Sequence, residues 1–207
     1  MNRTVTRWWL VRHAPVIGHK GRIYGSNDVP ADVSDSATFR KLAASLPADS
    51  LLVSSHLSRA KRTAEALVDG GLRFADRIIE KDLGEQDFGD WQGRTWEDIS
   101  AEEEAVGAHK FWTAPASHSP PGGESFHNVI ERVGRVVQRL TNHHSGRDIV
   151  AVTHGGTIRA ALAHALEMDP EIALGFATEN LSTTRLDHVS GDGVGGNWRV
   201  AFVNTRT

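Results

Sequence analysis

Short apolar segments rich in β-forming residues alternate along this chain with segments of helical period. The apolar segments are Trp8–Val11, Leu51–Ser55 and Asp148–Val152, and Ile78–Ile79 lies in a further one. The segments of helical period are Phe39–Leu46, Leu57–Val68, Phe126–Leu140 and Ile158–Leu166. Strands that alternate with helices form parallel sheets whose two faces are covered by helices. The order of segments therefore predicts an α/β fold, a three-layer α/β/α sandwich with a mostly parallel central sheet.

The remaining segments fit one domain of this class. The chain has 207 residues, a length that suits a single domain, and we expect residues 1–207 to form one. Residues 94–120 contain a run of glutamates and end in prolines, and we expect them to form a helical, lid-like insertion. Residues 181–189 and 198–203 flank a glycine-rich turn, which predicts a hairpin at one edge of the sheet.

Composition and charge exclude several classes of protein. Hydrophobic residues make up 39% and charged residues 24% of the chain, so it is neither disordered nor fibrous. The formal charge is -3 and no long basic run occurs, which argues against nucleic acid or a membrane as a partner. There is no cysteine for a disulfide or a zinc-thiolate site, and no apolar stretch typical of a signal peptide or a membrane span. We therefore expect a cytoplasmic protein.

Basic side chains follow the apolar segments at the points where strands end. Arg12 and His13 follow the first, Arg59 lies a few residues beyond the second, and His154 with Gly155 follows the last long one. A single histidine or arginine at such a place is usually a capping or solvated residue. Ligands of parallel α/β sheets, however, bind beyond the carboxyl ends of strands. The spacing alone therefore indicates an anion site, since arginine holds phosphate oxygens and a neutral imidazole can attack phosphorus.

Five segments together resemble the motifs of the histidine phosphatase superfamily, also called phosphoglycerate mutase-like. In chain order they are Leu10-Val11-Arg12-His13-Ala14, residues 54–64 with Ser55 and Arg59, residues 83–93 with Glu85, Pro121-Gly122-Gly123-Glu124-Ser125, and Val152-Thr153-His154-Gly155-Gly156. They occur in the family's order and span most of the chain. The resemblance implies the phosphoglycerate mutase-like version of the predicted sandwich.

The resemblance also implies roles for individual residues. His13 would be the nucleophile that becomes phosphohistidine, and Arg12, Arg59 and His154 would surround the phosphoryl oxygens. Glu85 would protonate the leaving group and later accept a proton from water. The spacing does not by itself select Glu85 over Asp82, Asp87 or Asp90, which share its loop. No metal and no other cofactor is implied.

The first motif departs from the family's pattern. The usual glycine after the histidine is Ala14, and the usual Thr and Asn a few residues on are Val16 and His19. The replacement of the usual Thr and Asn removes polar contacts to the phosphoryl group. We expect Gly155 to line the substrate site with Arg12, Arg59 and His154, and we include His19 and Asn27 as substitutes for the missing contacts.

The implied activity is hydrolysis of a small-molecule phosphate monoester. A mutase-type phosphoryl transfer is the alternative on the same scaffold, and the acidic segment after Glu85 disfavours it because mutases hold a second acidic group there. A catalytically inactive module that binds a phosphorylated ligand is a further alternative. Residues 24–30 resemble a loop of α-ribazole phosphatases. Trp91, Trp96 and Trp112 suit the wall of a substrate pocket or simple packing equally, and a homodimer is left open.

Overall fold

The computed structural model describes residues 3–19, 21–95, 97–99, 114–191 and 197–206. The strands are β1 (Val5–Arg12), β2 (Ser50–Ser55), β3 (Phe74–Glu80), β4 (Asp148–Thr153), β5 (Thr183–Val189) and β6 (Trp198–Thr205). The helices are α1 (Ser36–Ser45), α2 (Ser58–Asp69), α4 (Phe126–His143), α5 (Gly155–Leu166) and α6 (Pro170–Ala173), with single turns of 3-10 helix at η1 (Lys81–Leu83) and η2 (Gly89–Trp91).

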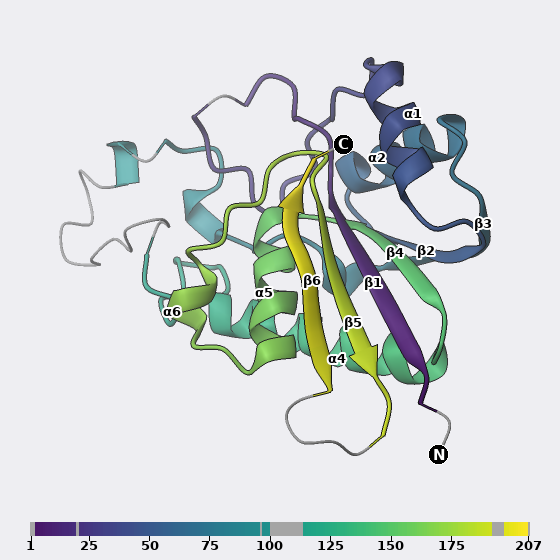
Figure 1. The fold of residues 1–207 in the computed structure, drawn as a ribbon. Helices are drawn as coiled ribbons and strands as arrows, with labels where there is room; N and C mark the ends of the chain where they lie inside the picture. The colour runs from purple at the N-terminus through teal and green to yellow at the C-terminus, as the bar shows by residue number, and fades with distance from the viewer. Residues whose placement is uncertain (1–2, 20, 96, 100–113, 192–196, 207) are drawn as a thin grey trace.

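The strands form one mixed sheet in the order β3-β2-β4-β1-β5-β6 (Figure 1). The pairs β3–β2, β2–β4 and β4–β1 are parallel, whereas β5 runs antiparallel to both of its neighbours. The prediction of a mostly parallel sheet is therefore confirmed, and the expected hairpin is β5–β6. This hairpin pairs with one side of β1, and the parallel strand β4 pairs with the other side, so β1 lies inside the sheet.

Helices cover both faces of the sheet. On β1, Trp8 and Leu10 pack in a cluster with α4 and α5, and the alternate residues Trp9 and Val11 face a cluster that contains α1 and α2. Successive residues of a strand point to opposite faces, so this division gives the predicted three layers. Figure 1 shows the α1–α2 pair and the α4–α5 pair beside different parts of the sheet.

Two helix starts differ from those predicted, each for a local reason. The first helix begins at Ser36 rather than Phe39, because the side chain of Asp35 accepts a hydrogen bond from Thr38 N and caps it. Helix α5 begins at Gly155 rather than Ile158. Its two glycines indicate a turn in the sequence, but here they are the first residues of the helix. The helix therefore starts directly beside the end of β4.

Most of the predicted insertion lies outside the described residues. Of residues 94–120, only 94, 95, 97–99 and 114–120 are described. Residues 97–99 are helical and residues 115–120 contain no helix. The helical, lid-like character of the insertion as a whole stays a prediction, and so does the single-domain organisation.

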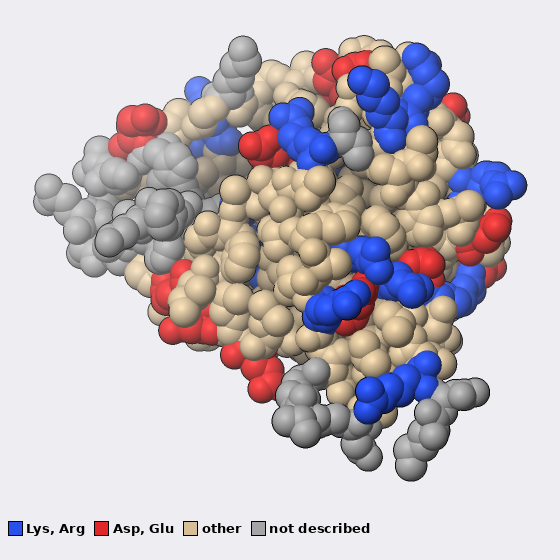
Figure 2. Space-filling model, viewed as in Figure 1, with Lys and Arg blue, Asp and Glu red and all other residues tan. Residues whose placement is uncertain are grey.

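Charges are mixed on the surface that Figure 2 shows. Lys and Arg side chains alternate there with Asp and Glu, and the described part of this face carries no broad patch of one sign. Among the described residues, no helix is long and apolar enough to cross a membrane.

The β5–β6 hairpin is fixed by a buried carboxylate. Asp187 on β5 is 1% exposed and pairs in register with Arg7 of β1 and Arg199 of β6. Its Oδ1 accepts a hydrogen bond from Arg185 Nε (2.8 Å), and its Oδ2 accepts one from Arg199 Nη2 (2.7 Å). Burial by itself raises the pKa of Asp187, but the hydrogen bonds from the two arginines outweigh burial and hold this pKa below its ordinary value.

We predict that Asp187→Asn lowers the free energy of unfolding by about 2 kcal/mol at pH 7, because a buried carboxylate loses its charge-assisted hydrogen bonds from Arg185 and Arg199. Asp76→Asn removes a carboxylate that is 61% exposed and paired with Arg147, and should change it by less than about 0.5 kcal/mol. Urea unfolding measures both. The folded-state pKa of Asp187 is depressed, so the wild-type advantage is complete above about pH 4 and declines as the pH falls further. Equal losses in the two variants would contradict this role.

Candidate active site

The ends of β1 and β4 bring the two predicted site histidines together. Arg12 is paired in register with Thr153, and His13 N donates a hydrogen bond to Thr153 O (2.9 Å). His13 directly follows the last residue of β1, and His154 directly follows the last residue of β4. The centroids of the two imidazole rings are 5.1 Å apart. The parallel register thus places His13 and His154 side by side at one edge of the sheet.

The His13 ring has one bonded and one free nitrogen. It is completely buried, and its Nδ1 lies 2.7 Å from Ala14 O. Burial, followed by the charge of Arg59, lowers the pKa of His13 to about 3. The ring is therefore neutral at neutral pH, and since a carbonyl can only accept, Nδ1 carries the proton. The buried Nε2 has no hydrogen-bond partner among the described residues, so its lone pair is available for attack on an electrophile.

His154 is buried with both ring nitrogens occupied. Nδ1 accepts a hydrogen bond from Arg59 Nε (3.2 Å), so Nε2 carries the proton and donates it to Ser55 Oγ (2.7 Å) at the end of β2. Burial and the charge of Arg59 hold the pKa of His154 well below its ordinary value. A direct contact of His154 with phosphoryl oxygens, as the resemblance implies, would require Nε2–H to leave Ser55, and it stays a prediction.

Arg59 is a completely buried cation at the start of α2. Besides His154, it donates Nη1–H to Asn27 O (2.7 Å) and Nη2–H to Gly25 O. The ring of Tyr24 lies 5.0 Å from its Cζ, in a cation–π arrangement. The loop around Tyr24 therefore holds the guanidinium in place through backbone carbonyls and an aromatic ring, while the carboxylates of Glu85 and Asp28 interact with it electrostatically.

Arg12 is anchored by the loop that precedes β5. Its Nη1 donates to Thr178 O, and in the same loop Asn180 Nδ2 donates to His13 O (2.8 Å). Arg12 Nε is buried and, within the described residues, without a partner. The loop that precedes β5 thus positions both Arg12 and His13.

Glu85 is the carboxylate of its loop that faces the start of α5. Its Oε2 accepts a hydrogen bond from Gly156 N (3.2 Å), and it interacts electrostatically with Arg59 and Arg159. In contrast, Asp82 is exposed, and Asp87 accepts a hydrogen bond from Gly89 N within a turn. The spacing left this choice open, and the geometry favours the residue that the resemblance had indicated.

The Glu85 loop is held by contacts from α4 and from residues 121–125. Arg132 donates hydrogen bonds to the carbonyl oxygens of residues 82, 84 and 85 (2.7, 2.9 and 3.2 Å) and to the carboxylate of Glu124. Gly89, at φ +49, lies so close to Pro121 O that any side chain there would collide with it. Two of the five motifs are thus joined, and Arg132 is the positioning residue that connects them.

His19 and Asn27 were proposed as substitutes for the missing polar contacts of the first loop. Their side chains contact residues other than His13 and Arg12. The His19 ring contacts Tyr24, 6.3 Å between centroids. Asn27 is exposed, its Oδ1 accepts from Gln92 Nε2 (3.3 Å), and it contributes its backbone carbonyl to Arg59. Val16 forms an isolated bridge with Ala31. Substrate contacts by His19 and Asn27 stay predictions.

Arg159 belongs to this cluster and was missed by the sequence analysis. It lies one turn into α5, and its Nε donates to Phe176 O (2.7 Å). Burial lowers the pKa of Arg159 to about 10, although Glu85 opposes the shift. An arginine inside a helical segment usually indicates a solvated face, but its spacing of one turn from Gly155 was a signal that it shares the site.

Trp91 packs in the interior, where it also borders a small hollow together with Phe88 and His118. It is 2% exposed in a cluster with Ile23, Phe88, Ile99 and Ala114, and its ring stacks on His118 at 5.2 Å. Trp96 and Trp112 lie outside the described residues.

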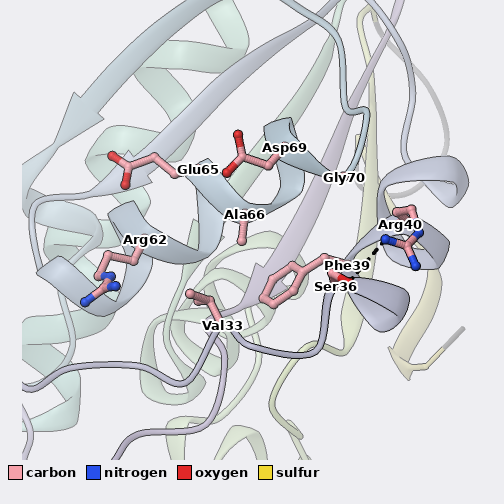
Figure 3. A pocket seen from close by; sticks show the side chains of 9 residues that line it. All are labelled: Val33, Ser36, Phe39, Arg40, Arg62, Glu65, Ala66, Asp69 and Gly70. Carbon is pink, nitrogen blue, oxygen red and sulfur yellow. Dashed lines mark hydrogen bonds between the residues drawn. The ribbon is translucent and has the colours of Figure 1, made fainter.

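A hollow of about 280 Å³ lies between α1 and α2 and shares no residue with the cluster. Figure 3 shows Phe39 pointing toward α2, with Arg62, Glu65 and Asp69 along that helix and Arg40 on the other side. Its charges are of both signs, and the Ser36 hydroxyl that lines it accepts a hydrogen bond from Arg40 Nη1 (3.2 Å). Elsewhere in the described part of the chain, no group of three or more His, Asp or Glu side chains could hold a metal ion.

Known proteins resemble this chain in both sequence and structure. The bifunctional protein Rv2228c of Mycobacterium tuberculosis is 33% identical over 172 residues, which are 79% of this chain and 45% of that protein. This chain thus spans less than half the length of that curated relative. The adenosylcobalamin/alpha-ribazole phosphatase of Salmonella typhimurium is 27% identical over 89% of this chain and 92% of its own.

A solved structure and a family match agree with these relatives. The native structure of the mycobacterial glucosyl-3-phosphoglycerate phosphatase Rv2419c superimposes with a TM-score of 0.81 at 28% identity, over 97% of this chain and 99% of its own. Residues 8–201 match the histidine phosphatase superfamily (branch 1). This range contains all five motifs and the site residues His13, Arg59, Glu85 and His154. The chain therefore belongs to the histidine phosphatase superfamily.

Proposed function

We propose that this protein hydrolyses a small-molecule phosphate monoester through a phosphohistidine intermediate on His13. The observation that carries the proposal is the buried, neutral imidazole whose Nε2 has no partner in the described structure and lies among arginines. The lone pair of Nε2 attacks phosphorus, and the N–P bond forms as the ester P–O bond breaks. Negative charge that develops on the phosphoryl oxygens is stabilised by Arg12 and Arg59.

Glu85 completes both steps of the proposed reaction. In its protonated form it gives its proton to the leaving alkoxide, and as a carboxylate it then takes a proton from the water that attacks the phosphohistidine. Its hydrogen bond from Gly156 N and the support of its loop by Arg132 keep the carboxylate at the start of α5. The products are the alcohol, inorganic phosphate and the free imidazole of His13.

Relatives support the reaction class but do not select a substrate. One is named for alpha-ribazole and another for glucosyl-3-phosphoglycerate, and these molecules have little in common beyond the phosphate ester. An inactive binding module is disfavoured because nucleophile, arginines and acid are all present in one cluster. We include in the proposal a cytoplasmic setting, for which the absence of cysteine is the support, and leave a homodimer open.

We predict that the purified protein releases inorganic phosphate from p-nitrophenyl phosphate in the presence of EDTA, since guanidinium groups supply the charge that a metal would otherwise provide. His13→Asn should lower the rate by at least about 1,000-fold, while His127→Asn, at an exposed position on α4, serves as the matched control. Loss of activity in EDTA with recovery on added metal would contradict metal independence. With 3-phosphoglycerate as the substrate, an isomeric ester as the product, in place of inorganic phosphate, would indicate the mutase alternative.

A further prediction concerns the proton donor. Glu85→Gln keeps the size of the side chain but removes the proton, so alkyl phosphates should lose about 100-fold or more in rate and aryl phosphates, which leave more easily, clearly less. The ratio of alkyl to aryl rates, measured by rapid quench of the first step, should therefore fall. Asp82→Asn, in the same loop but exposed, is the control. If Asp82→Asn lowers that ratio and Glu85→Gln does not, the acid is assigned to the wrong residue.

A further inference from the structure

The loop after β1 and the loop that carries the proposed proton donor are paired through their backbones. Gly93 N donates a hydrogen bond to Ile23 O (2.6 Å), and Ile23 N donates one to Arg94 O (2.9 Å). Because these bonds involve no side chain, they set the register of the two loops whatever residue stands at position 92. In that register, Gln92 lies beside Ser26.

The side chain of Gln92 holds the loop after β1 by hydrogen bonds to two successive residues. Its Oε1 accepts from Ser26 N (2.6 Å) and Ser26 Oγ (3.0 Å), and its Nε2 donates to Asn27 Oδ1 (3.3 Å). A Cβ on Gly25, at φ +42, would lie 2.5 Å from Gln92 Oε1. Glycine at position 25 therefore permits the close approach of this amide to the loop.

The residues on either side of Ser26 hold Arg59. Gly25 O accepts a hydrogen bond from Arg59 Nη2, and Asn27 O accepts one from Nη1 (2.7 Å). Together with the bond from Nε to His154, they use three of the five N–H groups of the guanidinium. The group is planar, so the two carbonyl oxygens decide where its other N–H groups point. Under the proposed function, those N–H groups bind phosphoryl oxygens.

The nearby carboxylates do not take over this orienting role. Glu85 and Asp28 interact electrostatically with Arg59, but their hydrogen bonds go elsewhere. Asp28 Oδ1 accepts from Ser58 N (2.7 Å), and Glu85 Oε2 accepts from Gly156 N (3.2 Å). Attraction between charges has no preferred direction, whereas a hydrogen bond does. The direction of the guanidinium therefore depends on the loop after β1.

We propose that Gln92 is a positioning residue for Arg59, and that it acts through Ser26 to set the direction of the guanidinium that receives the phosphoryl group. The inference rests on the proposed function for the identity of that group. Glu85 is held separately, by Arg132 at its carbonyl oxygen and by the start of α5 at its carboxylate. Loss of the Gln92 amide should therefore affect binding of the phosphoryl group and leave protonation of the leaving group unchanged.

The test replaces the amide and measures phosphate binding and turnover separately. Gln92→Met keeps the length of the side chain but neither accepts from Ser26 nor donates. It should weaken binding of inorganic phosphate, measured by calorimetry, by about 10- to 100-fold, because a displaced guanidinium loses charged hydrogen bonds. It should also lower kcat/KM for alkyl and aryl phosphates by one common factor, so that their ratio keeps the wild-type value. Gln138→Met, at an exposed position on α4, is the matched control.

A double-mutant cycle tests the route through Arg59. Arg59→Lys keeps the positive charge but lacks the planar fork that the two carbonyls orient. In that background, Gln92→Met should cost less than about 3-fold in phosphate affinity, because the group that Gln92 positions is gone. An undiminished loss in the double variant would mean that Gln92 acts by another route, and the proposal would be wrong.

The remaining outcomes separate this inference from the proposed function. Thermal unfolding checks that each variant is folded, and Gln92→Asn, which is polar but too short to reach Ser26, should give the same losses if the methionine variant is unstable. Wild-type phosphate affinity in a folded variant, or a lower alkyl-to-aryl ratio, would overturn the role at Arg59. Calorimetry needs no turnover, so absence of His13-dependent hydrolysis would overturn the proposed function alone, and weaker phosphate binding would still support the role of Gln92.

Discussion

The hydrogen bond from Arg59 to His154 is the contact on which the rest of the site depends. Both residues are completely buried, and the bond fixes the proton of His154 on Nε2, where Ser55 accepts it. The same guanidinium lies near enough to His13 to lower its pKa together with burial. A buried cation is unfavourable unless its donors are satisfied, and here backbone carbonyls of residues 25 and 27 satisfy them without a negative charge. The positive field is thus retained for an anionic ligand.

Buried polar atoms without partners mark where the fold gives up stability for chemistry. His13 Nε2, Arg12 Nε and Thr178 Oγ1 are among them, and all three lie at the edge of the sheet where β1 and β4 end. Such groups lower stability in the absence of a ligand. The surrounding structure offsets this with well-partnered supports, namely Arg132 with Glu124 under the Glu85 loop and Asp187 within the β5–β6 hairpin.

The sequence predicts the three-layer sandwich because the spacing of apolar residues indicates which faces of each strand and helix are buried. The segments at residues 8–11, 51–55 and 148–152 are apolar on both faces, as buried parallel strands must be. Arg12, His13 and His154 could be placed together on that basis alone. Glu85 could not be, since four carboxylates share its loop and only their contacts with α5 distinguish them. Arg132 and Arg159 were missed because an arginine on an amphipathic helix usually faces solvent, and its tertiary partners are distant in sequence.

The central claim is that His13 accepts the phosphoryl group, and trapping that intermediate tests it most directly. Wild-type protein mixed with ³²P-labelled p-nitrophenyl phosphate is quenched in alkali within milliseconds, because phosphohistidine survives alkali and is lost in acid. Peptide mapping should then place the label on His13, and Glu85→Gln should accumulate more of it as its hydrolysis slows. Turnover by wild type with no label on any histidine, or with the label on another residue, would contradict the account.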